Sequence, residues 1–273
     1  LPIWKMAGGV GRLFVVVVLV GVASQWWWSP RSDEEASADL GFGTMFDRIA
    51  ARYDATNRVM SLGMDGGWRR TMVAALELRG TDRVLDLATG TADVAILEGR
   101  EASSVLGVDP SANMLGLGRD KVARARLATT VTLELGDATN LTTLGDATFD
   151  KISIAFGIRN IPDVAKALRE MRRVAAPNAR LAVLEFCEPE GQILAPLARL
   201  FIRYVVPPVG ALLSGSNWEE YRHLQRSIAA FPPPPAFAAL VRQAGFRLPE
   251  DNIRFLAFGS VALYVADASE PEG

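Results

Sequence analysis

The sequence predicts an α/β protein in which a mostly parallel, seven-stranded sheet carries helices on both faces. Past residue 42, short apolar runs of strand length alternate with helical patterns, which is typical of chains that build parallel sheets through crossover helices. The apolar run from Arg83 to Leu87 leads into a turn at Thr89-Gly90-Thr91, and a second run then ends at Asp109. This order of strand, tight turn, helix start and strand indicates a βαβ unit with a ligand edge at the turn.

The remaining elements follow the same alternation of apolar periodicity and turn residues. Predicted helices cover residues 46–60, 68–78, 93–100, 111–126 and 164–174, and a last one runs from the prolines at 232–235 to residue 245. Predicted strands cover residues 83–87, 105–109, 131–135, 149–156 and 179–186, and residues 253–258 and 261–266 form a closing antiparallel pair. The stretch 191–231 is rich in Pro and aromatic residues, so we expect an inserted helical cap there.

The N-terminal residues differ in composition from the rest of the chain. Residues 10–23 are almost wholly apolar, with Arg12 as the one charge, and three tryptophans follow at 26–28. A run of about 14 residues is short for a membrane span and is typical of a targeting signal or a marginal anchor, with a buried core helix as the structural alternative. We therefore expect a targeting or anchor segment with its linker at 1–41, a folded domain at 42–268 and a tail at 269–273.

Composition narrows the chemistry that this chain performs. A length of 273 residues with 49% hydrophobic content supports one large α/β core. The 29 basic and 31 acidic residues give no electrostatic footprint for nucleic acid. The single cysteine, Cys187, excludes an internal disulfide framework and a cysteine metal cluster, and the single histidine, His223, excludes a multi-histidine metal centre. Catalysis must therefore use carboxylates, Arg, Tyr or a cofactor.

The turn after the first strand has the features of a nucleoside site. Gly90 lets the backbone approach a ligand where a Cβ would collide. Asp109 lies about 20 residues further on, where the second strand of a βαβ unit brings a carboxylate to the hydroxyls of a ribose. Ala88 and the residues after Ala92 replace the outer glycines of the dinucleotide fingerprint, so a pyrophosphate would fit badly. The pattern favours an adenosine without phosphates, as in S-adenosylmethionine; the alternative is an ordinary βαβ turn with a surface Asp.

Other polar residues follow the neighbouring strands and are expected at the same edge of the sheet. After the third strand, Asp137 could accept a hydrogen bond from an adenine amine while the small Ala138 leaves room for the ring. The fourth strand delivers Arg159 and Asn160. The structural alternatives are a turn residue for Asp137 and a surface salt bridge for Arg159.

Five segments of the chain together resemble a known family. They are MFDRIAARYDATNRVMSLGMDGGWRR, VLDLATGTAD, FGIRNIPD, LEFCEP and NWEEYRHLQRSI. The chain is similar in these segments to the ubiquinone/menaquinone biosynthesis C-methyltransferases, which have the Rossmann-like fold of class I S-adenosylmethionine-dependent methyltransferases. The similarity extends over residues 42–266. The FGIRN segment and the YDxxNxxMSLG pattern are more specific than the glycine turn, which the whole superfamily shares.

The resemblance implies methyl transfer from S-adenosylmethionine to a ring carbon of a polyprenylated benzoquinol or naphthoquinol, in ubiquinone, menaquinone or phylloquinone biosynthesis. It implies that Arg159 and Asn160 face the quinol and that Tyr221 lies near the mouth of the substrate site. The residues implied to hold the cofactor are Asp86, Gly90, Thr91, Asp109, Asp137 and Ala138.

This chain also departs from the family pattern at three positions. The family often has Gly where this chain has Thr89 and Ala92, and often Ser where it has Ala155. From these departures we expect weaker binding of the cofactor.

For the chemical step, the family picture gives Arg159 a part in removing a proton from the quinol hydroxyl through a water. A guanidinium stays charged below a pH of about 12, so Arg159 is a poor base. Our hypothesis is that Arg159 stabilises the developing phenolate, while water or a carboxylate such as Asp93 takes the proton.

The expected partners follow from an isoprenoid substrate. Residues 195–213 combine apolar residues with Arg199 and Arg203, a pattern typical of a helix at a membrane interface and equally of one packed on the sheet. We expect peripheral membrane contact, most simply at the matrix side of the mitochondrial inner membrane, with a plastid or a bacterial cytoplasmic membrane as alternatives. The sequence leaves open a homodimer or a quinone-biosynthesis complex. The alternative functions are a non-catalytic member of such a complex and an NAD(P)-dependent oxidoreductase.

Overall fold

A computed structural model of the chain describes residues 46, 47, 50, 54, 57, 58, 61, 63–188 and 226–268. The predicted N-terminal segment (1–41), the tail (269–273) and most of the predicted cap, including Tyr221 and His223, lie outside the described residues.

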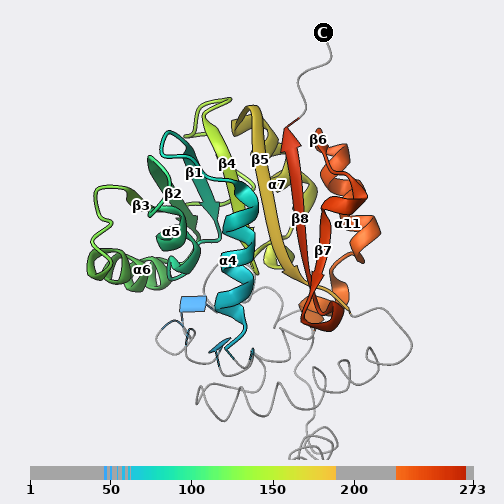
Figure 1. The fold of residues 1–273 in the computed structure, drawn as a ribbon, viewed down its shortest axis with the longest axis horizontal. Helices are drawn as coiled ribbons and strands as arrows, with labels where there is room; N and C mark the ends of the chain where they lie inside the picture. The colour runs from blue at the N-terminus through green and yellow to red at the C-terminus, as the bar shows by residue number, and fades with distance from the viewer. Residues whose placement is uncertain are drawn as a thin grey trace, which may run out of the picture.

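A single mixed sheet forms the centre of the described molecule, with strand order β3-β2-β1-β4-β5-β8-β6 and with β7 paired to β8 (Figure 1). The strands are β1 (Arg83–Leu87), β2 (Ser104–Asp109), β3 (Val131–Leu135), β4 (Phe149–Ala155), β5 (Ala175–Phe186), β6 (Phe246–Arg247), β7 (Ile253–Leu256) and β8 (Val261–Ala268). Strands β1 to β5 pair in parallel, and β8 pairs antiparallel with β5, β6 and β7.

The predicted mostly parallel α/β sheet is confirmed, with two differences in detail. The sheet has eight strands where seven were expected, because the two-residue β6 pairs with the end of β8. A strand of two residues is too short to produce a hydrophobic period that sequence analysis detects. Strand β5 begins at Ala175 rather than at residue 179, since the backbone enters the sheet directly after the preceding helix.

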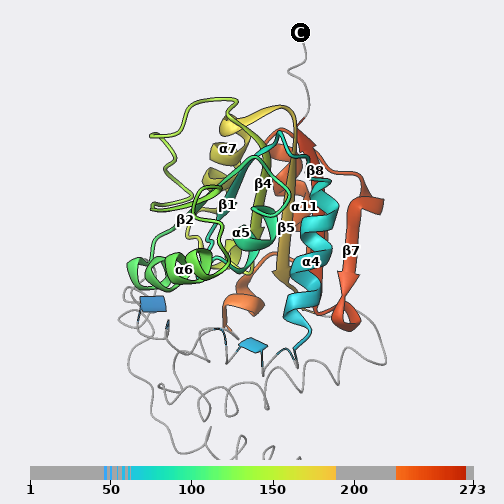
Figure 2. The same cartoon turned by 60° about the vertical axis from the view of Figure 1, so that its left-hand side comes forward.

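Helices cover both faces of the sheet (Figures 1 and 2). They are α4 (Asp65–Leu76), α5 (Asp93–Glu98), α6 (Ala112–Arg124), α7 (Val164–Val174) and α11 (Pro234–Gln243), with short 3-10 turns η2 (Ile158–Asn160), η3 (Glu250–Asn252) and η4 (Ala257–Gly259). The described residues of the predicted 46–60 helix are also helical: 46, 47, 50, 54, 57 and 58.

Alternate residues of the strands separate the core into two layers. On one side Leu85 and Ile152 pack in the same cluster as residues of α7 and α11. On the other side, residues of α4 and α5 pack with β5 and β8, while Val84 packs with α5 and α6. Buried β1 residues on both faces explain why this strand is a continuous apolar run rather than an alternating one.

Two neighbouring strand ends touch so closely that one of them needs glycine. Ala88 follows β1 with a left-handed φ of 49°, and Gly157 follows β4. A Cβ built on Gly157 would lie 2.4 Å from the Cβ of Ala88, which is far inside van der Waals contact. The loop after β1 and the loop that carries Arg159 are therefore in direct contact.

We expect Gly157→Ala to lower the free energy of unfolding by about 1–3 kcal/mol, the usual cost of overpacking. The φ of Gly157 is −115°, which any residue adopts, so the collision with Ala88 alone causes the loss. Ala88→Gly removes the colliding methyl group. The double variant should therefore be more stable than the sum of the two single effects predicts, by a coupling energy of about 1 kcal/mol measured by urea unfolding.

The matched control is Gly116→Ala in α6, where a Cβ meets no atom within 4 Å. This variant should be neutral or more stable by about 0.5–1 kcal/mol, as expected for Ala in a helix interior. Additive effects of Gly157→Ala and Ala88→Gly would contradict the proposed contact.

Candidate active site

The carboxyl ends of the parallel strands meet at one edge of the sheet, at the lower side of Figure 1. In open α/β sheets this edge binds ligands. The structure places at this edge the residues that follow β1 to β4, among them Gly90, Asp109, Asp137 and Arg159.

Asp109 and Gly90 join the ends of β2 and β1. The backbone N–H of Gly90 donates to Oδ2 of Asp109 at 2.8 Å, and that of Ser111 donates to Oδ1 at 2.9 Å. Each carboxylate oxygen has a second lone pair, so Asp109 keeps acceptor capacity for the two hydroxyls of a ribose. Gly90 has a φ of 55°, and among the described residues a Cβ built on it would meet no atom within 4 Å, so this part of the structure leaves room for a ligand above the turn.

Asp47, near the start of the predicted 46–60 helix, is bound to the same edge. Asp47 accepts hydrogen bonds from the Ser111 hydroxyl at 2.5 Å and from the backbone of Asn113 at 3.0 Å, at the start of α6. Burial raises the pKa of Asp109, and the nearby charge of Asp47 adds to this, while the N–H donors of Ser111 and Gly90 oppose it. Residues far apart in sequence thus surround the Asp109 carboxylate.

Thr91 and Asp93 belong to a separate polar cluster on the α6 side. The Thr91 hydroxyl donates to Oδ1 of Asp54 at 2.7 Å and accepts from Lys121 Nζ at 3.0 Å. Lys121 also donates to Asp54 at 2.9 Å and forms a close ion pair with Asp93. The carboxylate of Asp93 is therefore already neutralised by a cation.

Asp137 caps its own turn while Ala138 is buried. The Thr139 backbone N–H and hydroxyl each donate to one oxygen of Asp137, both at 2.8 Å. This is the turn role that was the structural alternative for Asp137. Its second lone pairs leave room for a further donor such as an adenine amine.

Asp86 points into the protein rather than toward the open turn. The hydroxyls of Thr89 and Ser153 donate to it at 2.6 and 3.0 Å, and its residue exposure is 1%. Burial raises the pKa of Asp86 to about 7, and the charge of Asp109 adds to this shift. Asp86 thus stabilises the turn after β1 by accepting the hydrogen bond from Thr89.

Glu98, the last residue of α5, lies close to Asp86. It is fully buried, and within the described part of the chain neither of its carboxylate oxygens has a hydrogen-bond partner. Burial raises the pKa of Glu98 well above its ordinary value, and the charge of Asp86 raises it further. Burial without a partner disfavours the charged form of such a carboxyl.

Arg159 is the cationic centre of the opposite half of the edge. Its Nη1 donates to Oε1 of Glu185 at 2.6 Å and to the backbone oxygen of Phe156 at 2.7 Å. The side chain is only 6% exposed, and Glu185 only 1%. The alternative of a surface salt bridge does not hold, because this ion pair is buried.

Aromatic rings complete the surroundings of Arg159. Its guanidinium carbon lies 5.4 Å from the centre of the Phe186 ring, which packs on Phe156 with centroids 4.6 Å apart. Phe156 has a left-handed φ of 57°, an unusual conformation for an aromatic residue. This bend turns the chain at the end of β4 and precedes the η2 turn that carries Arg159.

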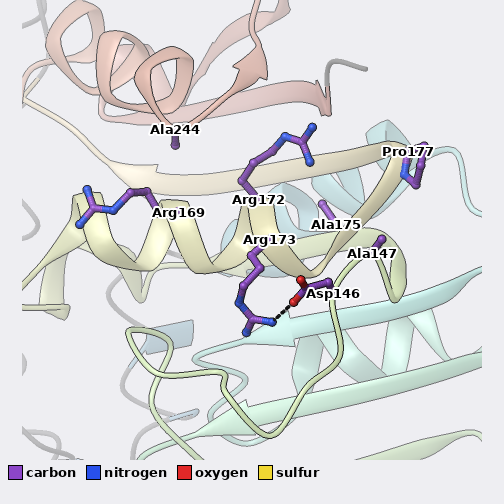
Figure 3. Close-up of a pocket in the computed structure, with 8 residues that line it drawn as sticks. All are labelled: Asp146, Ala147, Arg169, Arg172, Arg173, Ala175, Pro177 and Ala244. Carbon is purple, nitrogen blue, oxygen red and sulfur yellow. Dashed lines mark hydrogen bonds and ion pairs between the residues drawn. The ribbon is translucent and has the colours of Figure 1, made fainter. Parts of the chain in front are cut away.

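A pocket of about 470 Å³ lies at the other edge of the sheet (Figure 3). It is lined by the end of α7, the start of β5 and Ala244. Arg173 turns toward Asp146, whereas Arg169 and Arg172 point away from that pair. The pocket lies at the amino-terminal end of β5, so it is separate from the candidate active site.

Comparison with known proteins identifies the family. The model of the ubiE/COQ5 methyltransferase family matches residues 34–267. The chain belongs to this family. It is 42% identical over 225 residues to the demethylmenaquinone methyltransferase of Deinococcus radiodurans, covering 82% of this chain and 90% of that protein. It is 38% identical over 226 residues to the ubiquinone/menaquinone biosynthesis C-methyltransferase UbiE of Geobacter sulfurreducens, covering 82% and 86%.

A solved structure agrees with the fold. The crystal structure of a SAM dependent methyltransferase from Aquifex aeolicus superposes with a TM-score of 0.52 at 19% identity, over 73% of this chain and 89% of that chain. Membership of the ubiE/COQ5 methyltransferase family confirms the expected activity, S-adenosylmethionine-dependent C-methylation in quinone biosynthesis, and sets the oxidoreductase alternative aside.

The two positions where the family resemblance led us to expect glycine differ in their surroundings. Ala92 precedes α5 in a left-handed conformation with a φ of 65°, which glycine adopts without strain. Thr89, by contrast, uses its hydroxyl to bind Asp86. Alanine therefore strains the backbone at position 92, whereas threonine adds a hydrogen bond at position 89.

Sequence analysis missed Glu185 and Glu98. Glu185 lies in the LEFCEP segment at the end of β5, so the rule that selected Asp109, a carboxylate at the end of a parallel strand, would have found it. Glu98 gave no comparable signal, because a glutamate at a helix end ordinarily faces solvent.

Within the part of the chain that the structure describes, no helix is both long and apolar enough to span a bilayer.

We expect Glu98→Gln to be more stable than the wild type at pH 8 by about 1–3 kcal/mol, because burial without a partner disfavours the charged form of Glu98, which is favoured in the unfolded chain at this pH. A carboxyl with a raised folded-state pKa contributes stability that is fully present below its unfolded pKa and lost as the pH rises through the folded pKa. Glutamine removes that loss, so the pH dependence of urea unfolding between pH 5 and 9 should become shallower.

Glu170→Gln is the opposite control. Arg173 lowers the pKa of Glu170 by hydrogen bonding, so this group stabilises the fold above its unfolded pKa and the variant should lose stability at neutral pH. A Glu98→Gln protein that is less stable than the wild type at pH 8 would show that Glu98 is charged and paired.

Proposed function

We propose that this enzyme methylates a ring carbon of a prenylated naphthoquinol. The observation that carries this proposal is the buried guanidinium of Arg159, at the end of β4, beside the turn after β1. A cation in this position stabilises negative charge that develops on a hydroxyl-bearing ring next to the methyl donor.

The ring class follows from the names of the relatives. The Deinococcus protein is named for demethylmenaquinone, and the Geobacter protein for both ubiquinone and menaquinone biosynthesis. The naphthoquinone ring is common to both names, which supports it as the substrate ring. A benzoquinol serves as the comparison substrate in the test below.

The residues at the turn fit the methyl donor. Asp109 has lone pairs left for the ribose hydroxyls, Gly90 has open space above it, and Asp137 with Ala138 would border the adenine. Thr91 and Asp86 would act indirectly, because both side chains are buried in hydrogen bonds to other residues. When bound, S-adenosylmethionine supplies an activated methyl group with its own leaving group.

The protein's own contribution is to align the ring and to increase its electron density. A phenol-like hydroxyl has a pKa of about 10 and is mostly protonated at neutral pH. Arg159 remains a cation and would stabilise the phenolate next to the target carbon, with Asn160 and Tyr221 contacting the quinol. Water or Asp93 would accept the proton; Asp93 already forms an ion pair with Lys121, which favours water.

We propose that the enzyme acts at a membrane surface, because a polyprenyl tail partitions into lipid. The apolar residues 195–213, outside the described part of the chain, and the exposed Phe255 and Phe258 support peripheral contact. The relatives in Deinococcus and Geobacter favour a bacterial cytoplasmic membrane over a mitochondrial or plastid one. A homodimer or a quinone-biosynthesis complex remains a proposal for its assembly.

The full chain should transfer a labelled methyl group from S-adenosylmethionine to a short-chain demethylated naphthoquinol in reducing buffer. We expect a higher kcat/KM with the naphthoquinol than with the matching benzoquinol, since the relatives share the former ring. Asp109→Ala serves as the cofactor-site control and should bind the donor weakly in calorimetry. No transfer to either ring by the wild type would favour a non-catalytic member of a complex.

Two substitutions separate the roles of Arg159 and Asp93. Arg159→Lys keeps the charge but loses the planar fork, so kcat should fall by about tenfold or more. Asp93→Asn should lower kcat less than Arg159→Lys does, because Asp93 is already paired with Lys121. A loss of about 100-fold or more in Asp93→Asn would instead identify Asp93 as the general base.

A further inference from the structure

The donors of Arg159 are almost all committed within the protein. Nη1 serves both Glu185 and the Phe156 carbonyl, and Nε donates to the Ser227 hydroxyl at 3.3 Å. Among the described residues, Nη2 makes no hydrogen bond or ion pair. The guanidinium therefore offers one amino group for an external acceptor.

Glu185 is committed to Arg159 in return. Its Oε1 accepts from Nη1 of Arg159 and from the backbone N–H of Phe186 at 2.7 Å, while its Oε2 accepts from the backbone N–H of Arg159 at 3.3 Å. One carboxylate thus holds both the guanidinium and the peptide of the same residue. Burial raises the pKa of Glu185, and the charge of Arg159 is the largest influence that opposes this.

The Phe186 ring controls the remaining freedom of the guanidinium. Glu185 and the Phe156 carbonyl hold Arg159 at Nη1, and Phe186 lies against the group at 5.4 Å. A planar group held at Nη1 and Nε and packed against a ring has little freedom to rotate. The direction of Nη2 is then set by the partners of the guanidinium, among them Glu185 and Phe186 of β5, and not by Arg159 alone.

We propose that Glu185 is a positioning residue that aims Nη2 of Arg159 at the hydroxyl oxygen of the quinol and balances the charge of Arg159 before the proton leaves. This inference rests on the proposed function of the site. Glu185 acts through Arg159 and does not contact the substrate.

The charge balance gives a signature that a purely structural ion pair lacks. In Glu185→Gln the guanidinium loses its counter-charge, so the site becomes more positive and favours the phenolate. The acidic limb of the kcat profile should then move to lower pH. At the same time the guanidinium is held less firmly, so the plateau of kcat should fall by about 10- to 100-fold.

The test compares full-length wild type, Glu185→Gln and Glu185→Asp in the labelled-methyl assay with the short-chain naphthoquinol. Glu185→Gln should show the lower plateau and the shifted limb, with the KM for S-adenosylmethionine within about twofold of wild type. Glu185→Asp keeps the charge on a shorter side chain, so it should lower kcat without moving the limb. If Glu185→Gln does not fold, Glu185→Asp alone decides, and an unchanged kcat overturns the proposal.

Glu170→Gln is the matched control, because it also removes a glutamate from an ion pair with an arginine, Arg173. Glu170 belongs to α7, and its partner Arg173 lines the pocket at the amino-terminal edge of the sheet. The kcat and the pH profile of the Glu170→Gln enzyme should equal those of the wild type.

A crystal structure of Glu185→Gln adds a readout that needs no activity. The proposal expects a displaced or disordered Arg159 guanidinium, and a guanidinium in its wild-type position with wild-type kcat overturns it. A wild type that is inactive on both quinols refutes the proposed function and, with it, the proposal that Arg159 Nη2 points at a quinol hydroxyl. An active wild type with an unaffected Glu185→Gln refutes the positioning role alone.

Discussion

Strand β1 lies between β2 and β4 in parallel register, and the contacts at the candidate active site depend on this placement. Parallel strands end at the same edge, so the loops after these three strands must share one small volume. On one side of β1 the Gly90 N–H binds Asp109. On the other side Ala88 rests where a side chain on Gly157 would be. The half of the candidate active site that would hold the methyl donor and the half that carries Arg159 are thus both held in place by β1.

The buried carboxyl groups around this strand end have opposite environments. Glu185 meets a guanidinium and two N–H donors, whereas Glu98 lies near another acid and its carboxylate makes no hydrogen bond among the described residues. A buried charge is tolerated when a partner replaces its hydration, and otherwise the group takes up a proton. The same type of side chain is therefore a counter-ion at β5 and an unpaired, buried acid at the end of α5.

Much of this arrangement could be predicted from the sequence, because it depends on local signals. The apolar runs of β1 and β2, the glycine at the turn and the carboxylate that closes β2 specify a βαβ unit by period and spacing alone. Strand β6 has only two residues, too few for a period to show. The pairing of Arg159 with Glu185 joins residues 26 positions apart, one in η2 after β4 and one in β5, and only their shared edge of the sheet brings them together. The contacts of Lys121 with Asp93 and Thr91 are equally hard to predict, since Lys121 reaches both from α6.

The contacts of Asp47 and Asp54 have a consequence for the order in which the molecule is completed. Asp47 binds Ser111, 64 residues later, and Asp54 binds Thr91, 37 residues later. During synthesis this segment leaves the ribosome before its partners exist, and contacts between distant residues form late because closing a long loop is entropically costly. Both contacts require the turn after β1 and the start of α6 to be in place. Hydrogen exchange at the amides of Asp47 and Asp54 is therefore expected to follow the docking of α6 beside that turn.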